Sequence, residues 1–174
     1  MYITIGRTIR FWDDINSATV KTVVAEIQAY SERKPKEWIS LELHSAGGEF
    51  FSGLALCDWL SVRNVPLQII GLGRVDSMAV AVFAMGQYRV AGPNCSFFLH
   101  QPGATYEAKT RLDIDRLHGE TERLELIQKQ YVQILLRRMT NPPTEEELIK
   151  IMADEKRLSA EQALEIGLVN EVIK

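Results

Sequence analysis

Hydrophobic residues along this chain switch repeatedly between the spacing of a helix and the spacing of a strand. At 17–31 they recur every three or four positions, which predicts an amphipathic helix. At 38–43 they alternate with polar residues, which predicts a strand, and at 67–72 they form a short unbroken run typical of a buried parallel strand. The expected strands are 8–11, 38–43, 67–72, 87–91, 96–99 and 168–173, and the expected longer helices are 17–31, 51–63, 77–86 and 112–139.

Two further helices near the C-terminus are indicated by their first residues. Thr144 with Glu147 and Ser159 with Gln162 are capping-box pairs, in which side chains satisfy the free backbone amides of a helix start. Gly167 is suited to end the second helix, because glycine readily adopts the left-handed conformation found there.

The helices at 77–86 and 112–139 differ in character. The first helix has small apolar residues on all of its faces, which is typical of a helix in the interior of a molecule. The second is charged on one face and apolar on the other. Its apolar stripe is long enough to form an interface with another subunit, although the domain itself would also be able to cover it. The stripe consists of Leu117, Leu124, Ile127, Tyr131, Ile134 and Leu135.

The alternation of strands and helices predicts an α/β fold. No linker, repeat or low-complexity segment interrupts it, so we expect a single domain over 1–174, with the long helix projecting from it.

The composition argues against several classes of function. The chain of 174 residues is 46% hydrophobic and 25% charged, with a net charge of -3. Lysine and arginine are nowhere concentrated, so neither a nucleic acid nor a membrane is an expected partner. The N-terminus has no long apolar stretch of a signal peptide, and no apolar run approaches the length of a membrane span. We therefore expect a cytoplasmic protein.

The two cysteines, Cys57 and Cys95, lie in apolar surroundings. We expect both to be buried, reduced thiols, because their spacing is not that of a metal site or a redox motif. No metal and no cofactor is expected.

Three places along the chain have residues suited to chemistry. The first is the turn Ser45-Ala46-Gly47-Gly48, which follows a predicted strand. Its glycines leave a backbone amide unshielded, and such an amide can stabilise an oxyanion. A tight turn that requires a positive φ would explain the same glycines without any chemistry.

The second place is Ser77-Met78, at the start of the interior helix. A serine there is commonly a helix cap, but its hydroxyl and the next amide also lie at the positive end of a helix. The third is His100, at the end of an apolar strand, where functional groups gather in parallel sheets. A neutral imidazole there would be able to accept the proton of a serine, and a hydrogen-bonded core histidine is the structural alternative.

Taken together and in this order, these motifs resemble the proteolytic subunit of the Clp protease over nearly the whole chain. The similarity rests on SAGGEFFSGLALCDWL, GRVDSMAVAVFAMG, GPNCSFFLHQP and RLSAEQALEIGLVNEVI. It implies a ClpP/crotonase-like spiral of βαβ units with a long projecting helix. It also implies a serine endopeptidase that cleaves peptides or unfolded proteins through an acyl-enzyme.

Carried over position by position, the resemblance implies that Ser77 is the nucleophile and His100 the general base. The amides of Gly48 and Met78 would form the oxyanion hole. The third member of the triad is a carboxylate ahead of Leu158-Ser159-Ala160. Direct alignment gives Glu155, and a shifted loop would give Asp154, so both remain candidates.

The chain departs from the family beside the nucleophile. Asp76 precedes Ser77 where the family usually has a small residue, and Ala46 replaces a common proline in the glycine turn. An inward carboxylate at residue 76 would oppose formation of an oxyanion. Arg74 is the candidate we identify to pair with it.

The family also implies an assembly. Its subunits form a homo-oligomer of stacked rings that meet through the long helix, and an AAA+ unfoldase contacts axial loops of the N-terminal segment. Here the segment before the first predicted strand is short, which argues against that ATPase as a partner.

Two alternative interpretations stay open. Asp76 and the undecided acid are compatible with a catalytically impaired subunit that has a structural or regulatory role. A crotonase-type acyl-CoA enzyme would share the fold and a two-amide oxyanion hole. Such an enzyme does not require a serine at the helix start followed by His-Gln-Pro.

Overall fold

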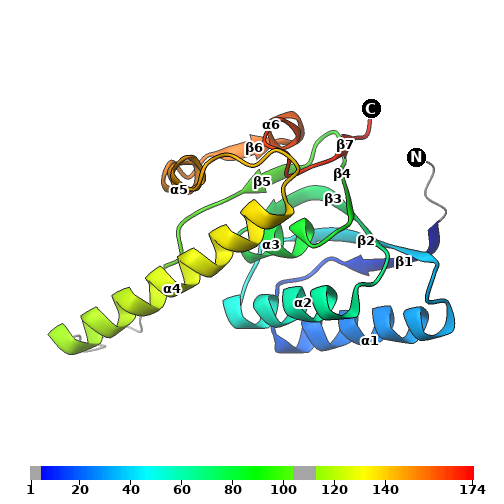
Figure 1. Cartoon of the computed structure of the whole chain (residues 1–174), viewed down its shortest axis with the longest axis horizontal. Coiled ribbons are helices and arrows are strands. Elements are labelled where there is room, and N and C mark those ends of the chain that lie inside the picture. Colours follow the sequence, from blue (N-terminus) through cyan, green and yellow to red (C-terminus); the bar gives the residue numbers. More distant parts are fainter. Residues whose placement is uncertain (1–4, 104–112) are drawn as a thin grey trace.

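A computed structural model describes residues 5–103 and 113–174. The helices and strands alternate along the chain as expected of an α/β protein (Figure 1). In chain order they are β1 (Ile5–Phe11), α1 (Ser17–Arg33), β2 (Trp38–Ser45), α2 (Phe50–Arg63), β3 (Leu67–Asp76), α3 (Met78–Ala84), β4 (Tyr88–Ala91), β5 (Ser96–Phe98), α4 (Ile114–Arg138), α5 (Glu145–Ala153), β6 (Arg157–Ser159), α6 (Ala160–Glu165) and β7 (Glu171–Val172).

The strands form one mainly parallel sheet in the order β1-β2-β3-β4-β7. The longest strand, β3, also pairs in parallel with β5 beyond the end of its pairing with β4. On its other edge β5 pairs antiparallel with β6. Helices α1 and α2 lie together on one side of the sheet, and the segment from α5 to α6 lies toward the other (Figure 1). The predicted fold class is confirmed.

Helix α3 is the centre of the core. All seven of its residues are buried, which confirms the interior helix that its apolar sequence predicts. It packs against β3, α2 and α4. The helix begins at Met78 rather than at Ser77, which has a backbone conformation that no helix contains.

Helix α4 extends away from the body (Figure 1). At 1.5 Å per residue, its 25 residues span about 37 Å. The buried residues of α4, which are Ile127, Tyr131, Val132 and Leu135, all lie in its second half. In the first half Ile114 and Leu117 are 71% and 47% exposed. The body therefore covers only one end of the apolar stripe.

Most other sequence predictions match to within a few residues, with three differences. Strand β3 continues to Asp76, β6 was not predicted, and the terminal strand is limited to β7. Both predicted capping boxes are present, at Thr144 and at Ser159, and Gly167 has the expected positive φ of 71°. The predicted start of the long helix at residue 112 and most of the loop before it lie outside the described residues. The extent of a single domain over 1–174 stays a prediction.

Candidate active site

The three motifs identified in the sequence meet at one edge of the sheet. Strand β2 leads into the glycine turn, β3 leads into Ser77, and β5 leads toward His100. Because these strands are parallel neighbours, their carboxyl ends lie side by side. The pairing of Asp76 with Phe98 places Ser77 next to the residues that follow β5.

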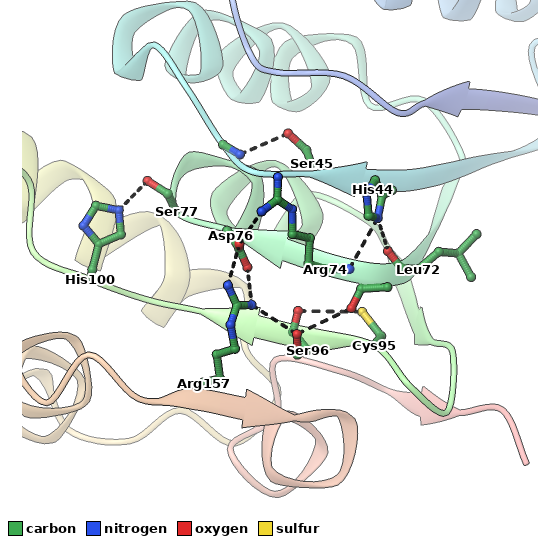
Figure 2. A network of polar contacts seen from close by, with 12 residues as sticks. His44, Ser45, Leu72, Arg74, Asp76, Ser77, Cys95, Ser96, His100 and Arg157 are labelled. Carbon is green, nitrogen blue, oxygen red and sulfur yellow. Dashed lines mark hydrogen bonds and ion pairs between the residues drawn. The ribbon is translucent and has the colours of Figure 1, made fainter.

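Ser77 and His100 are in direct contact (Figure 2). The Ser77 hydroxyl lies 2.8 Å from Nε2 of His100. The serine makes no side-chain cap to helix α3, so its hydroxyl is directed to the imidazole instead. The contact joins residues separated by 23 positions in the sequence, and it depends on the β3–β5 pairing.

Ser77 has a strained backbone. Its φ of 54° and ψ of -128° are rarely adopted by a residue with a side chain, and cost on the order of 1–3 kcal/mol. Three hydrogen bonds hold it in place, one of them from the Val80 amide to the Ser77 carbonyl at 2.9 Å. Its amide donates to the carbonyl of Phe98 at 2.7 Å, and the buried Tyr131 hydroxyl of α4 donates to the Ser77 carbonyl at 3.0 Å. The turn thereby raises the serine side chain above the end of the sheet.

The other nitrogen of His100 is bound to backbone. Nδ1 lies 2.7 Å from the carbonyl oxygen of Gln101. A carbonyl only accepts, so we assign the ring proton to Nδ1 and the free lone pair to Nε2. This is the tautomer that is able to accept a proton from Ser77.

The two carboxylates that precede β6 do not occupy the position next to Nδ1 of His100. Asp154 caps the end of α5 and lies 4.0 Å from the amine of Lys156, and Glu155 has a positive φ of 48°. Both are exposed. Within the described residues neither carboxylate contacts His100, whose Nδ1 is bound to Gln101 instead. The role of either acid stays a prediction.

The glycine turn lies directly against the nucleophile turn. Gly47 and Gly48 have φ values of 91° and 142°, which favour glycine. A side chain on Gly47 would approach the Asp76 carbonyl and the Ser77 Cβ to 2.7 Å, and one on Gly48 would collide with the backbone of Ile15. The close approach of these backbones therefore requires both glycines.

The amides of Gly48 and Met78 border the same space. The bridge to Ile15 uses the Gly47 carbonyl and the Glu49 amide, so it does not engage the amide of Gly48. The Met78 amide is in the first turn of α3, where no helical carbonyl is available to accept from it. Both residues line the cavity beside Ser77.

That cavity has a volume of about 260 Å³ and a lining of both polar and apolar residues. Ser77 and His100 form one polar end, and α4 supplies much of the wall, including the charged side chain of Arg123. The apolar side chains around it are Phe50, Met78, Leu124, Ile127, Tyr131 and Met152. Its size is suited to a single side chain beside the hydroxyl.

Asp76 points away from this cavity, into an ion pair (Figure 2). Its two carboxylate oxygens accept from the two terminal nitrogens of Arg157 at 2.8 and 2.9 Å. Arg74, the partner suggested by the sequence, is more distant at 4.0 Å. The bond to Asp76 raises the pKa of Arg157. Sequence reasoning missed Arg157, because its strand was not predicted.

Two classes of site are not found in the described ranges. There, no group of three or more histidine, cysteine, aspartate or glutamate side chains is arranged to hold a metal ion. None of the helices described combines the length and the apolar character that crossing a membrane requires.

An α/β fold with a serine–histidine pair at the carboxyl edge of a parallel sheet, open to a cavity, is the arrangement of hydrolases that use a serine nucleophile. The comparisons with known proteins identify the family within this class. A family model described as Clp protease matches residues 2–174. The chain belongs to the Clp protease family.

Curated relatives agree with this assignment. A protein of Dehalococcoides mccartyi strain 195, named ATP-dependent Clp protease proteolytic subunit, is 31% identical over 175 aligned positions, covering 97% of this chain and 82% of the relative. A protein of the same name from strain BAV1 is 28% identical with the same coverage. The resemblance inferred from the sequence is confirmed, and so is the prediction of a Clp-protease-like peptidase, a hydrolase, at the level of the family.

Proposed function

We propose that this protein is a serine endopeptidase that cleaves peptides or unfolded proteins through an acyl-enzyme. The observation that carries the proposal is the 2.8 Å contact between the Ser77 hydroxyl and Nε2 of His100. Distances in this range are those of a nucleophile and its general base. The unusual backbone of Ser77 adds support, because strained residues concentrate at functional sites.

In the proposed reaction, the Ser77 oxygen forms a bond to the scissile carbonyl carbon while Nε2 of His100 takes the hydroxyl proton. The carbonyl oxygen becomes an oxyanion, which the amides of Gly48 and Met78 stabilise. One such donor is worth about 3–4 kcal/mol in comparable enzymes. The carbon–nitrogen bond then breaks, and the imidazolium gives its proton to the leaving amine.

A water molecule completes the cycle. It attacks the ester carbon, His100 takes one of its protons, and breaking the ester bond returns that proton to the Ser77 oxygen. A third residue on Nδ1 would stabilise the imidazolium in both halves of the reaction. We propose Glu155, or Asp154 if the loop shifts, for that role, with the Gln101 carbonyl holding the ring in the present arrangement.

Membership of the Clp protease family implies protein substrates and an oligomeric assembly. We propose that the assembly is a ring, in which the exposed first half of α4 meets another subunit. Leu117 of the stripe is 47% exposed and Ile114, one turn earlier, is 71% exposed, so the described part of the chain does not cover this half of the helix. An AAA+ unfoldase as partner stays a prediction.

We also propose that the protein acts in the cytoplasm. Cys57 and Cys95 are both free and buried, which agrees with a reducing compartment.

A fluorophosphonate probe tests the proposed function directly. The folded oligomer should be labelled on Ser77, and Ser77→Ala should abolish both labelling and hydrolysis of a fluorogenic peptide. His100→Ala should slow labelling at least about 100-fold, since it removes the base. Ser31→Ala is the matched control, because that serine donates to the Gln28 carbonyl on α1 rather than to a residue of the site. Absence of labelling in the wild-type oligomer would refute the proposal and favour a non-catalytic subunit.

A further inference from the structure

The guanidinium of Arg157 contacts a neighbour of Ser77 and a neighbour of His100. Arg157 reaches from β6 across β5 to the end of β3, where it binds both oxygens of Asp76 (Figure 2). On the way it donates to the Ser96 hydroxyl at 3.1 Å. Its guanidinium carbon also lies 5.2 Å from the centre of the Phe98 ring. These contacts fix the side chain between three strands.

The first branch of this network leads to the nucleophile. Asp76 is the residue before Ser77 and is 5% exposed. Its paired carboxylate fixes the last residue of β3, from which the strained Ser77 turn begins. A two-point bond between a guanidinium and a carboxylate fixes direction as well as distance. Arg157 therefore restricts the position of the serine backbone.

The second branch leads to the base. The Phe98 ring, against which Arg157 rests, is stacked on the imidazole of His100 with 5.4 Å between centroids and 19° between planes. Phe98 therefore contacts both the guanidinium and the imidazole. Displacement of Arg157 would remove one of the contacts that hold Phe98 against His100.

The negative charge of Asp76 gives a second reason for its pairing with Arg157. Acylation creates a negative charge on the substrate oxygen next to Ser77, and a bare carboxylate at residue 76 would oppose it. The Arg157 charge compensates that of Asp76 through two short bonds. Arg74 and Arg157 are similarly exposed, at 51% and 46%, but Arg74 lies 4.0 Å from Asp76 and therefore compensates its charge less.

We propose that Arg157 is a positioning residue for peptide hydrolysis, which holds Ser77 through Asp76 and His100 through Phe98 and neutralises the carboxylate beside the oxyanion. This inference rests on the proposed function, since it concerns the same serine and histidine. It assigns a role to Asp76, the departure from the family pattern beside the nucleophile that otherwise argues against catalysis.

The test compares Arg157→Gln, Arg157→Lys and the double variant D76N/R157Q with the wild-type oligomer. Arg157→Gln should lower kcat for a fluorogenic peptide about 10- to 100-fold, as small displacements of reacting groups do, with little change in KM. Arg157→Lys retains the charge but not the two-point hydrogen bond to Asp76, so its kcat should lie between those of Arg157→Gln and the wild type. The kcat of D76N/R157Q should be at least about fivefold higher than that of Arg157→Gln, because no uncompensated carboxylate remains.

Arg74→Gln is the control, which removes the more distant cation near Asp76 and should leave kcat unchanged. Melting temperatures are measured for every variant. A purely structural role for Arg157 predicts that losses follow the melting temperature and vanish at temperatures well below it. Such a result would overturn the inference. If Arg157→Gln does not yield folded protein, Arg157→Lys carries the same comparison of kcat with stability.

The rate of fluorophosphonate labelling separates this inference from the proposed function. If the wild-type protein is not labelled, the proposed function itself fails. If wild type and Arg157→Gln are labelled at equal rates, Ser77 is a nucleophile without help from Arg157, and only the inference fails. Labelling that is slower in Arg157→Gln and partly restored in D76N/R157Q supports both.

Discussion

Tyr131 provides a one-atom test of how the nucleophile turn is held. Its hydroxyl, on the second half of α4, donates to the carbonyl of Ser77 at 3.0 Å. The side chain is 6% exposed, and burial raises the pKa of the phenol, so the hydroxyl remains a donor throughout the usual assay range. Tyr131→Phe removes this oxygen and leaves the packed ring in place.

The expected magnitude follows from the contacts that remain. An uncharged hydrogen bond contributes about 1 kcal/mol net. The Ser77 carbonyl keeps a second donor, the amide of Val80 at 2.9 Å, so the substitution does not leave it without a partner. We therefore expect a loss of about 1 kcal/mol, which lowers the melting temperature of a chain of this length by about 2–4 °C.

The rate at which Ser77 is labelled should fall by an amount that corresponds to the same free energy. The strain of Ser77, of order 1–3 kcal/mol, is balanced partly by the Tyr131 bond, so its loss favours relaxed conformations of the turn. A shift of 1 kcal/mol corresponds to about fivefold in rate. The assay is fluorophosphonate labelling of Ser77 under conditions in which both proteins are fully folded.

Tyr88→Phe is the matched control. The Tyr88 hydroxyl donates to Glu171 at 2.6 Å, on the surface and away from the site, so its removal should leave labelling unchanged. If Tyr131→Phe shows wild-type labelling and melting temperature, the Tyr131 bond does not hold the turn and the reasoning is wrong.

Two further predictions concern stability and the cysteines. The buried Arg89 donates to three backbone carbonyls, those of Gly86, Gly167 and Leu168, at 2.7–3.2 Å, so Arg89→Met should lower the free energy of unfolding by about 3 kcal/mol. Urea unfolding measures this, and a loss below about 1 kcal/mol would contradict it. Burial raises the pKa of Cys57 and of Cys95 to about 12, so at pH 8 neither thiol should react with a thiol reagent in the folded protein, whereas both should react after unfolding. Rapid reaction of one thiol per folded chain would count against the packing described.

Local patterns were enough to predict most elements. The helical spacing at 17–31 and the alternation at 38–43 correspond to α1 and β2, because each face of these elements meets a uniform environment over several residues. Strand β6 has only three residues and exists through its pairing with β5, some 60 positions earlier. A segment this short has no period to detect, so its partner determines it.

The site divides in the same way. Ser77 and His100 were selected because each follows an apolar strand or begins a buried helix, and these are local signals. Their separation of 2.8 Å depends on the register of β3 against β5. The partner of Asp76 was predicted as Arg74 because that residue is near in sequence, whereas folding brings Arg157 closer.

By itself, the sequence determined the α/β class, the interior helix, the family resemblance and the residues suited to nucleophile and base. Apolar periodicity, glycine turns and helix caps each involve a few neighbouring positions, so they can be recognised in the sequence. Only the tertiary structure decided the strained conformation of Ser77, its contact with His100, and the contacts of Arg157 with the neighbours of both residues. These features arise where strands distant in sequence are paired, because the position of a side chain across a sheet is set by register.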